Sequence, residues 1–187
     1  MQEISLLAYA LLGLLQQQPR SGYDLRKIFA NTPMGTFSDS PGAIYPALQR
    51  LERRGLVSSR VYASSGLRRR RLFRPTASGK RAFKSWQTRA ISSDDVVHRA
   101  DELMLRFSFM DETADSAQAM RFLRALIKEL AAYIPNLRHF LRVQGAGMPL
   151  SGRLALESGI RSYETLLQWT RSALGIYTRR RKRGARK

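Results

Sequence analysis

The stretch SDSPGAIYPALQRLERRGLVSSRVYASSGLRRRRLFR, residues 38–74, decides how the first half of the chain folds. Its Ser40 and Pro41 suit the start of a helix. A serine side chain accepts hydrogen bonds from free backbone N–H groups, and a proline in the first turn has no donor to leave unpaired. Apolar residues then recur at spacings of four and three as far as Gly55, a typical helix end. We therefore predict a helix over residues 40–54. Its core residues are Ile44, Leu48 and Leu51.

The opposite face of this predicted helix suits the major groove of DNA. It is small or flat near its N-terminus and carries basic or amide side chains further along. Arginine and glutamine side chains can read base edges in a groove about 12 Å wide. The predicted DNA-binding residues of this face are Ser40, Gly42, Tyr45, Pro46, Gln49, Arg50 and Arg53. For Arg50 and Arg53 there is an alternative, which is to pair with Glu52 or to stay in solvent.

A β-hairpin is predicted directly after this helix. Residues 57–62 are rich in strand formers, residues 64–66 have turn chemistry, and residues 69–74 form a returning strand. A short helix followed by a hairpin is the order of a recognition helix and a wing. The predicted DNA-binding residues of the wing are Arg68, Arg69, Arg70 and Arg71.

The positive charge of the chain is concentrated in two segments. The formal net charge is +19, yet residues 1–40 hold three basic and three acidic residues, and residues 91–175 hold ten of each. Residues 41–90 hold thirteen basic residues and one acidic residue, and residues 176–187 hold seven basic residues and no acidic one. A positive stripe on one helix and hairpin is the pattern expected of phosphate binding. A solvated basic face is the alternative interpretation.

Two further helices are predicted ahead of residues 40–54. Residues 4–15 are apolar almost all round, so this helix should be covered on several sides. A second helix starts at residues 21–25, with Tyr23 free to point outward. Together the three helices predict a helix-turn-helix core, with a loop over residues 31–39. The core residues of the second helix are Leu25, Ile28 and Phe29, and those of a helix after the wing are Ala82, Phe83 and Trp86.

Composition argues against several classes of protein. The chain of 187 residues has no cysteine, which excludes disulfides, thiolate metal sites and cysteine nucleophiles. His98 and His139 are far apart, and no phosphate loop or nucleophile motif is present, so we predict no enzyme, no metal and no cofactor. The apolar run over residues 4–15 is shorter than the roughly twenty residues that span a bilayer, and no basic leader precedes it. A cytoplasmic location is therefore expected.

The C-terminal half carries three apolar stripes at helical spacing, which predicts a helical bundle. Pro135 lies within the second stripe and predicts a kink or a helix boundary. Neutral charge balance favours dimerisation through these stripes, although folding of the domain alone would also use them. The predicted dimerisation residues are Met120, Leu123, Ile127, Leu130, Ile134, Leu156, Ile160, Tyr163 and Leu167. The aromatic residues Trp86, Trp169, Phe107 and Tyr163 suit either a pocket for a small aromatic effector at the dimer interface or core packing.

Three strings carry a resemblance to a known family. They are SGYDL at residues 21–25, PGAIYPALQRLERRGLV at 41–57 and RRRLFRPTASGKRAF at 69–83. In this order and spacing they resemble the winged-helix domain of the PadR family of bacterial transcriptional regulators. The resemblance implies that Tyr23, Tyr45 and the basic wing contact operator DNA, that the protein usually represses nearby genes, and that C-terminal helices join a homodimer.

Two details refine this resemblance. The wing of the family commonly carries a proline and mixed lysine and arginine, whereas residues 66–71 read GLRRRR here, which leaves open the groove that the wing prefers. Residues 101–107, DELMLRF, also resemble the start of the larger C-terminal domain in the virulence-activator-like branch of the family.

The sequence thus predicts a mainly α fold with a small β-hairpin. A winged helix-turn-helix domain for binding DNA is expected at residues 1–90, a helical dimerisation domain at 91–177 and a basic disordered tail at 178–187. The tail either adds phosphate attraction or serves as a solubilising end. The predicted function is a homodimeric repressor on an inverted repeat, with recognition helices roughly 34 Å apart. The alternatives are a nonspecific nucleic-acid-binding or architectural protein and a winged helix used only to bind proteins.

Overall fold

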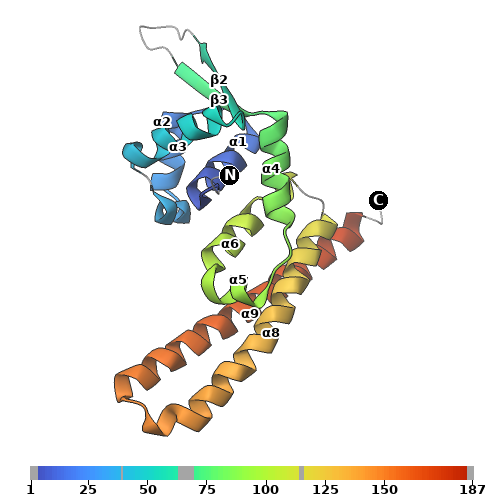
Figure 1. Ribbon diagram of the computed structural model, residues 1–187. Coiled ribbons are helices and arrows are strands. Elements are labelled where there is room, and N and C mark those ends of the chain that lie inside the picture. The colour runs from blue at the N-terminus through green and yellow to red at the C-terminus, as the bar shows by residue number, and fades with distance from the viewer. Residues whose placement is uncertain (1–3, 39, 63–69, 114–115, 185–187) are drawn as a thin grey trace. The chain divides into compact units, whose positions relative to one another are not determined.

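The chain divides into two compact units, Met1–Thr88 and Arg89–Lys187, and each is described by itself (Figure 1). The computed structural model describes residues 4–38, 40–62, 70–113 and 116–184. The first unit contains α1 (Leu6–Gln17), β1 (Arg20–Ser21), α2 (Gly22–Ala30), the 3-10 helix η1 (Pro33–Phe37), α3 (Pro41–Arg53), β2 (Val57–Tyr62), β3 (Arg70–Pro75) and α4 (Ala77–Thr88).

The sheet of the first unit has three antiparallel strands in the order β1-β3-β2. Strands β2 and β3 form the hairpin, in which Ser59 pairs with Phe73 and Tyr62 pairs with Arg70. The two-residue strand β1 pairs Arg20 with Phe73 along the other edge of β3. The hairpin is therefore attached to the segment that leads into α2 as well as to the end of α3.

Helix α1 lies at the centre of the first unit, with α3 on one side and α4 on the other (Figure 1). Its residues Leu11 and Leu12 are fully buried, as the apolar character of the helix on all sides predicts. The buried side chains that join the surrounding helices to it are Leu25, Phe29, Ile44, Leu48, Leu51, Phe73 and Phe83.

Helices α2 and α3 begin at serine caps. Ser21 and Asp24 form a capping box, in which the Ser21 hydroxyl accepts from the Asp24 N–H and the Asp24 carboxylate accepts from the Ser21 N–H. Ser40 Oγ accepts from the Gly42 N–H at 3.2 Å, and Pro41 follows at the first helical position. Gly55 ends α3 with a φ of 65°, a left-handed value that suits glycine. These local signals fix the start of both helices that carry candidate site residues.

The second unit contains α5 (Ser93–His98), α6 (Ala100–Ser108), α7 (Met110–Thr113), α8 (Ser116–Gln144), the 3-10 helix η2 (Gly145–Gly147) and α9 (Leu150–Gly184). Helices α8 and α9 form a long antiparallel hairpin around η2 (Figure 1). The core residues that α5, α6, α7 and α8 contribute are Val96, Leu103, Met110, Ala119, Phe122, Leu126, Leu130 and Ile134.

An ionic cluster is buried at the start of the second unit. The Arg106 side chain is wholly buried, and its guanidinium donates to the Arg89 carbonyl and lies 5.3 Å from the ring centroid of Phe122. The Arg89 guanidinium lies 2.7 Å from Asp95 and 3.4 Å from Glu102. Desolvation, together with nearby Arg89, lowers the pKa of Arg106 to about 10, so this guanidinium stays charged at neutral pH.

The predicted fold class is confirmed, and several local predictions need correction. Helix α8 continues through Pro135 to Gln144, so the helix boundary that was one of the two predictions for this position does not occur. Helix α9 continues to Gly184, so residues 178–184 are helical and not disordered. Residues 33–37 of the predicted loop form a 3-10 helix. Ser92 caps the start of α5, and Asp95 completes a capping box.

Candidate nucleic-acid interface

Helix α3 buries one face and exposes the face predicted to read DNA. Ile44 and Leu48 are fully buried, whereas Gly42, Gln49 and Arg53 on the opposite side are exposed. Tyr45 is 43% exposed, and Pro46 is half-buried. The structure therefore brings the predicted residues of this helix together on one surface, at whose N-terminal end the cap Ser40 is also exposed.

The Tyr45 ring is held against the first residue of α2. A Cβ added at Gly22 would lie 2.4 Å from Tyr45 Cε1, so the ring contacts the backbone of α2 directly. The adjacent Tyr23 side chain is 57% exposed, and the Arg26 guanidinium lies 5.7 Å from its ring centroid. Two tyrosines thus flank the start of α2, one fixed by packing and one projecting into solvent.

The described part of the wing places Arg70 and Arg71 on neighbouring positions of β3. Consecutive residues of a strand point to opposite faces, so the two arginines leave the hairpin in opposite directions. Their side chains are about half exposed. The predicted residues Arg68 and Arg69 lie outside the described residues.

Arg71 connects the wing to α3 through Glu52. Its Nη2 lies 2.6 Å from Glu52 Oε2, and its Nε donates to Ser59 Oγ at 2.8 Å. The Ser59 hydroxyl donates to Glu52 Oε1 at 2.6 Å, which closes a ring of three side chains. Glu52 therefore pairs with Arg71, and not with Arg50 or Arg53 as the alternative prediction proposed.

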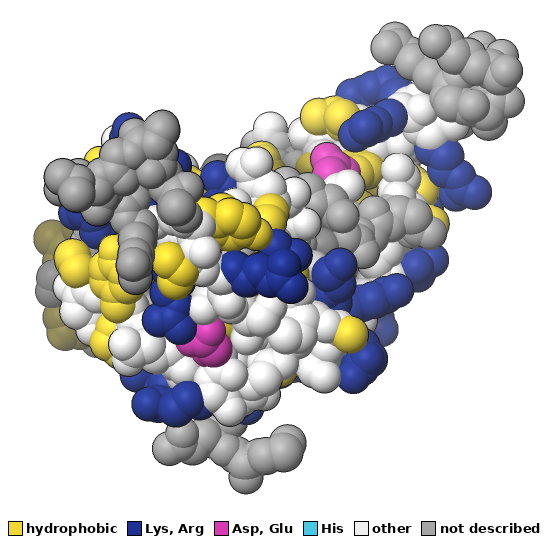
Figure 2. Space-filling view, turned by 90° about the horizontal axis from the view of Figure 1, so that it is seen from above, with side chains coloured by type: hydrophobic (Ala, Val, Ile, Leu, Met, Phe, Trp, Pro, Cys, Tyr) yellow, Lys and Arg dark blue, Asp and Glu magenta, His cyan; other side chains and the backbone are white. Residues whose placement is uncertain are grey.

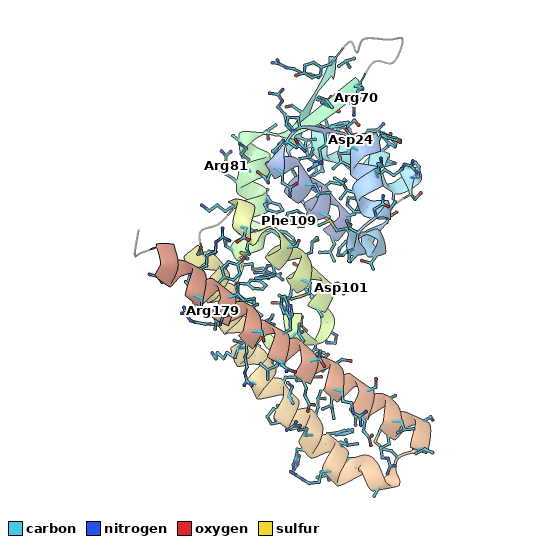
Figure 3. The ribbon with its side chains drawn as sticks, turned by 180° about the vertical axis from the view of Figure 1, so that it is seen from behind. Asp24, Arg70, Arg81, Asp101, Phe109 and Arg179 are labelled. Atoms are coloured by element: carbon cyan, nitrogen blue, oxygen red, sulfur yellow. The ribbon has the colours of Figure 1, made fainter. Side chains whose placement is uncertain are left out.

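Arg70 connects the wing to α2 through Asp24. Its Nη2 donates to both carboxylate oxygens of Asp24 at 2.9 Å (Figure 3). The same carboxylate accepts from the Ser21 N–H at 3.1 Å and from the Ser21 hydroxyl at 2.7 Å. Asp24 thus serves the capping box of α2 and the wing at once.

Both carboxyl groups are held ionised by these partners. Burial opposes ionisation of Asp24, but hydrogen bonds from Ser21 and the charge of Arg70 outweigh it and lower its pKa. The hydrogen bond from Ser59 is the main cause that lowers the pKa of Glu52, and Arg71 adds to it against a smaller desolvation effect. Both carboxylates are therefore ionised at neutral pH.

The first unit is otherwise almost free of acidic residues where it is described. That part of the unit holds thirteen lysine and arginine residues against two acidic residues, Asp24 and Glu52. Because both acids are already paired with the wing, most of the positive charge is uncompensated within the unit. Figure 2 shows lysine and arginine side chains at many places on one face of the molecule and acidic side chains at few. Such a field attracts polyanions.

A groove of about 360 Å³ adjoins the C-terminal half of α3. It lies between this helix and the N-terminal end of α1, and Ser5 caps that end by accepting from the Ala8 N–H at 3.3 Å. Three arginines of the groove have no ion pair among the described residues: Arg50, Arg53 and Arg54. Free guanidinium groups beside the exposed face of α3 extend the surface that phosphates can contact.

The predicted dimerisation residues lie mainly inside the second unit. Met120, Leu123, Leu130, Ile134 and Ile160 are at most 5% exposed in a single chain. Leu130 and Ile134 belong to the core cluster of the unit, whereas Ile127, Leu156, Tyr163 and Leu167 are half-buried. The part that these residues play in dimerisation stays a prediction. The large apolar residues that this unit exposes are Phe140, Val143, Leu150, Leu154, Trp169 and Ile176.

The aromatic residues considered for an effector pocket are spread over several contacts. Trp86 stacks on Tyr9 in the first unit, with ring centroids 4.2 Å apart. In the second unit the Phe107 ring meets Trp169 edge-on at 5.3 Å, and Tyr163 meets Tyr133 at 5.2 Å. Trp86 therefore belongs to core packing, and Trp169, at 41% exposed, remains accessible.

Sequence reasoning missed Asp24 and Glu52 as parts of the interface. The β pairing would have placed Arg70 and Arg71 on opposite faces, but their partners lie 46 and 19 residues away along the chain. No pattern among residues that are neighbours in the sequence predicts such ion pairs. Strand β1 was missed as well, because two residues are too few to show a period.

The described residues contain neither a metal-binding cluster nor a membrane-spanning helix. Among the residues that the structure describes, no three His, Asp or Glu side chains gather as a metal ion would require. Within the same ranges, no helix combines the length and apolar character needed to cross a membrane.

Known proteins resemble the chain over most of its length. It is 24% identical over 177 residues to the negative transcriptional regulator PadR of Bacillus subtilis, covering 91% of this chain and 96% of that protein. The crystal structure of Bacillus subtilis PadR in complex with operator DNA is 23% identical, with 92% of this chain and 99% of that chain covered and a TM-score of 0.45. The same protein in complex with p-coumaric acid is 24% identical, with coverages of 93% and 99% and a TM-score of 0.42.

A family model matches the first unit of the chain. Residues 11–85 match the model of the transcriptional regulator PadR-like family, and this range holds nearly all of the described winged helix, from α1 to α4. The predicted resemblance is thereby confirmed, and the family is one of regulators and not of enzymes. The winged-helix part of the chain is thus similar to the PadR-like family of transcriptional regulators.

Proposed function

We propose that the protein is a homodimeric repressor that binds an inverted-repeat operator, with α3 in the major groove and the wing beside it. One observation carries the proposal. The exposed face of α3 holds Gly42, Tyr45 and Gln49 with flanking arginines, in a unit whose two described acids are already paired. Small residues let the helix approach the groove, and glutamine and arginine can read base edges.

Selection of bound sequences from a random duplex pool tests this proposal most directly. The expected result is a palindromic consensus with half-sites about one helical turn apart, roughly 34 Å. The Gln49→Ala variant should lower operator affinity by about 1 to 3 kcal/mol and leave random-sequence affinity nearly unchanged. Recovery of no consensus would favour a nonspecific nucleic-acid-binding protein.

Dimerisation is assigned to the exposed apolar residues of the α8–α9 hairpin. Phe140, Val143, Leu150 and Leu154 are each at least 50% exposed and lie on either side of the η2 turn. Exposed apolar residues gathered at one end of a helical hairpin mark an interaction surface more often than a solvated one. Sedimentation should show a dimer, and Leu150→Glu with Leu154→Glu should shift it toward monomer. The matched control is Arg153→Glu on the same turn.

A small aromatic effector is the second part of the proposal. Trp169 packs on Phe107 and keeps 41% of its surface exposed, so an aromatic ligand has a ring to stack on. Adding p-coumaric acid should quench the fluorescence of Trp169. The buried Trp86 serves as an internal control, because the Trp169→Phe variant retains it and should lose the quenching. Quenching that persists in Trp169→Phe would contradict this assignment.

A further inference from the structure

Glu52 and Asp24 are the only two acidic residues among the described residues of the first unit, and both lie at the candidate interface. Glu52 lies on α3, three residues after Gln49, and Asp24 lies on α2 next to Tyr23. A carboxylate at such a place repels the phosphates of DNA. Some other contribution of these two side chains must offset that repulsion if the surface binds DNA.

The ion pairs with the wing contribute too little folding stability to be that contribution, although Asp24 also completes the capping box of α2. The Arg70 and Arg71 side chains are 54% and 49% exposed, and ion pairs as exposed as these contribute little to folding stability. The contacts are nevertheless specific. Each carboxylate is held by one serine and one arginine, at distances between 2.6 and 3.1 Å.

The two contacts connect the wing to the two DNA-facing helices from opposite sides. Arg70 and Arg71 are consecutive on β3, so their side chains leave opposite faces of the hairpin. Arg71 reaches Glu52 on α3, and Arg70 reaches Asp24 on α2. Tilting the hairpin toward either side would stretch one contact while compressing the other.

We propose that Glu52 and Asp24 are positioning residues that fix the angle between the wing and the recognition helix, and thereby set the preference for operator over random DNA. This inference rests on the proposed DNA-binding function. The two carboxylates act through Arg71 and Arg70 and touch no base or phosphate themselves. The wing arginines accordingly have two roles, in which part of each guanidinium holds the hairpin and the exposed remainder faces the phosphates.

The proposal makes a prediction opposite to that of simple electrostatics. Glu52→Gln removes a negative charge while keeping the size of the side chain, so charge alone predicts tighter binding to every duplex. Positioning predicts tighter binding to random DNA but weaker binding to the operator. The ratio of the two affinities should fall about tenfold in Glu52→Gln and in Asp24→Asn, within the range that one mismatched base pair costs.

The test measures dissociation constants of the full-length protein on a selected operator and on a random duplex of equal length, at two salt concentrations. Asp101→Asn, an exposed acid of the second unit, is the control for loss of one negative charge. The exchanged pair, Glu52→Arg with Arg71→Glu, keeps the net charge and can restore the contact, so it should recover part of the ratio. The melting temperature of each variant is measured as well. If a variant lost the affinity ratio only because it folds less stably, the exchanged pair could not restore the ratio without also raising the melting temperature.

The outcomes are separable. If Glu52→Gln binds both duplexes more tightly by the same factor, the acid only repels phosphate. If Glu52→Gln changes neither affinity, the ratio is again unchanged, and the acid positions nothing. Either result overturns this inference and leaves the proposed function standing. A wild-type protein without preference for any duplex would instead overturn the proposed function and this inference together.

Discussion

Substitution of Gly79 is predicted to destabilise the fold, because the backbone of α4 closely approaches the backbone of Leu56 at this residue. A Cβ added there would lie 1.9 Å from the Leu56 carbonyl oxygen and 2.9 Å from the Leu56 carbonyl carbon. That oxygen already accepts from the Thr76 N–H at 3.0 Å, and the Thr76 hydroxyl donates to the Gly55 carbonyl at 2.6 Å. The start of α4 is therefore joined directly to the turn between α3 and the wing.

Two opposing effects decide the result of Gly79→Ala. Alanine is favoured over glycine within a helix by about 1 kcal/mol. An ordinary contact would require the carbonyl and the methyl group to separate by a further ~1.5 Å, and overpacking of this kind costs about 1 to 3 kcal/mol, occasionally more. Because the obstacle is backbone and not a flexible side chain, we expect the upper part of this range and a net destabilisation of about 1 to 2 kcal/mol.

Urea unfolding followed by circular dichroism measures this change, with Gly159→Ala as the matched control. Gly159 lies within α9, where an added Cβ would have no neighbour within 4 Å, so alanine there should stabilise its unit by up to about 1 kcal/mol. The two variants should therefore shift unfolding in opposite directions. A Gly79→Ala protein as stable as the wild type would refute the reasoning from close backbone approach.

Three further predictions concern the interface and the buried ionic cluster. Gly22→Ala should displace the Tyr45 ring and lower operator affinity as Tyr45→Ala does, and additive losses in the double variant would contradict a shared cause. Arg50→Ala should lower the slope of log affinity against log salt by about 1 if the guanidinium meets a phosphate, and an identical slope would remove it from the interface. Burial opposes ionisation of Asp95, yet Ser92 and Arg89 lower its pKa from 3.8, so it stabilises the fold above about pH 4 and loses this effect as pH falls through the lowered value. Asp95→Asn should accordingly lower the melting temperature at pH 7, and the loss should become smaller as the pH falls below about 4. An equal loss throughout this range would contradict the linkage.

The sequence was sufficient where local signals agree. Ser40, Pro41 and Gly55 mark both ends of α3 within one residue, and the apolar spacing between them identifies its buried face. The strands of the wing were placed equally well, because alternation and turn chemistry lie next to each other in the chain. These signals depend on neighbours in sequence, and such neighbours are visible without a structure.

Features that depend on distant partners were not predictable in the same way. The apolar stripe around Leu130 is equally suited to a dimer surface and to a core. Only the packing of α5, α6 and α9 against α8 shows that Leu130 lies in a core. Pro135 was expected to kink or end α8, and the helix does not end there but runs on to Gln144. The partners of Arg70 and Arg71 likewise required the folded chain.

The helical conformation of residues 179–181 limits how far their arginine side chains can reach. Tyr177 donates to Asp111 at 2.7 Å and Arg180 lies 3.7 Å from the same carboxylate, which fastens the last turns to α7. Cations there also compensate the partial negative charge of the helix C-terminus. Consecutive side chains leave an α-helix in directions about 100° apart, because the helix has 3.6 residues per turn. This spacing applies to Arg179, Arg180 and Arg181. Their positive charges surround the helix, and each extends only as far as one side chain reaches from the helical backbone. A disordered tail could contact a more distant polyanion.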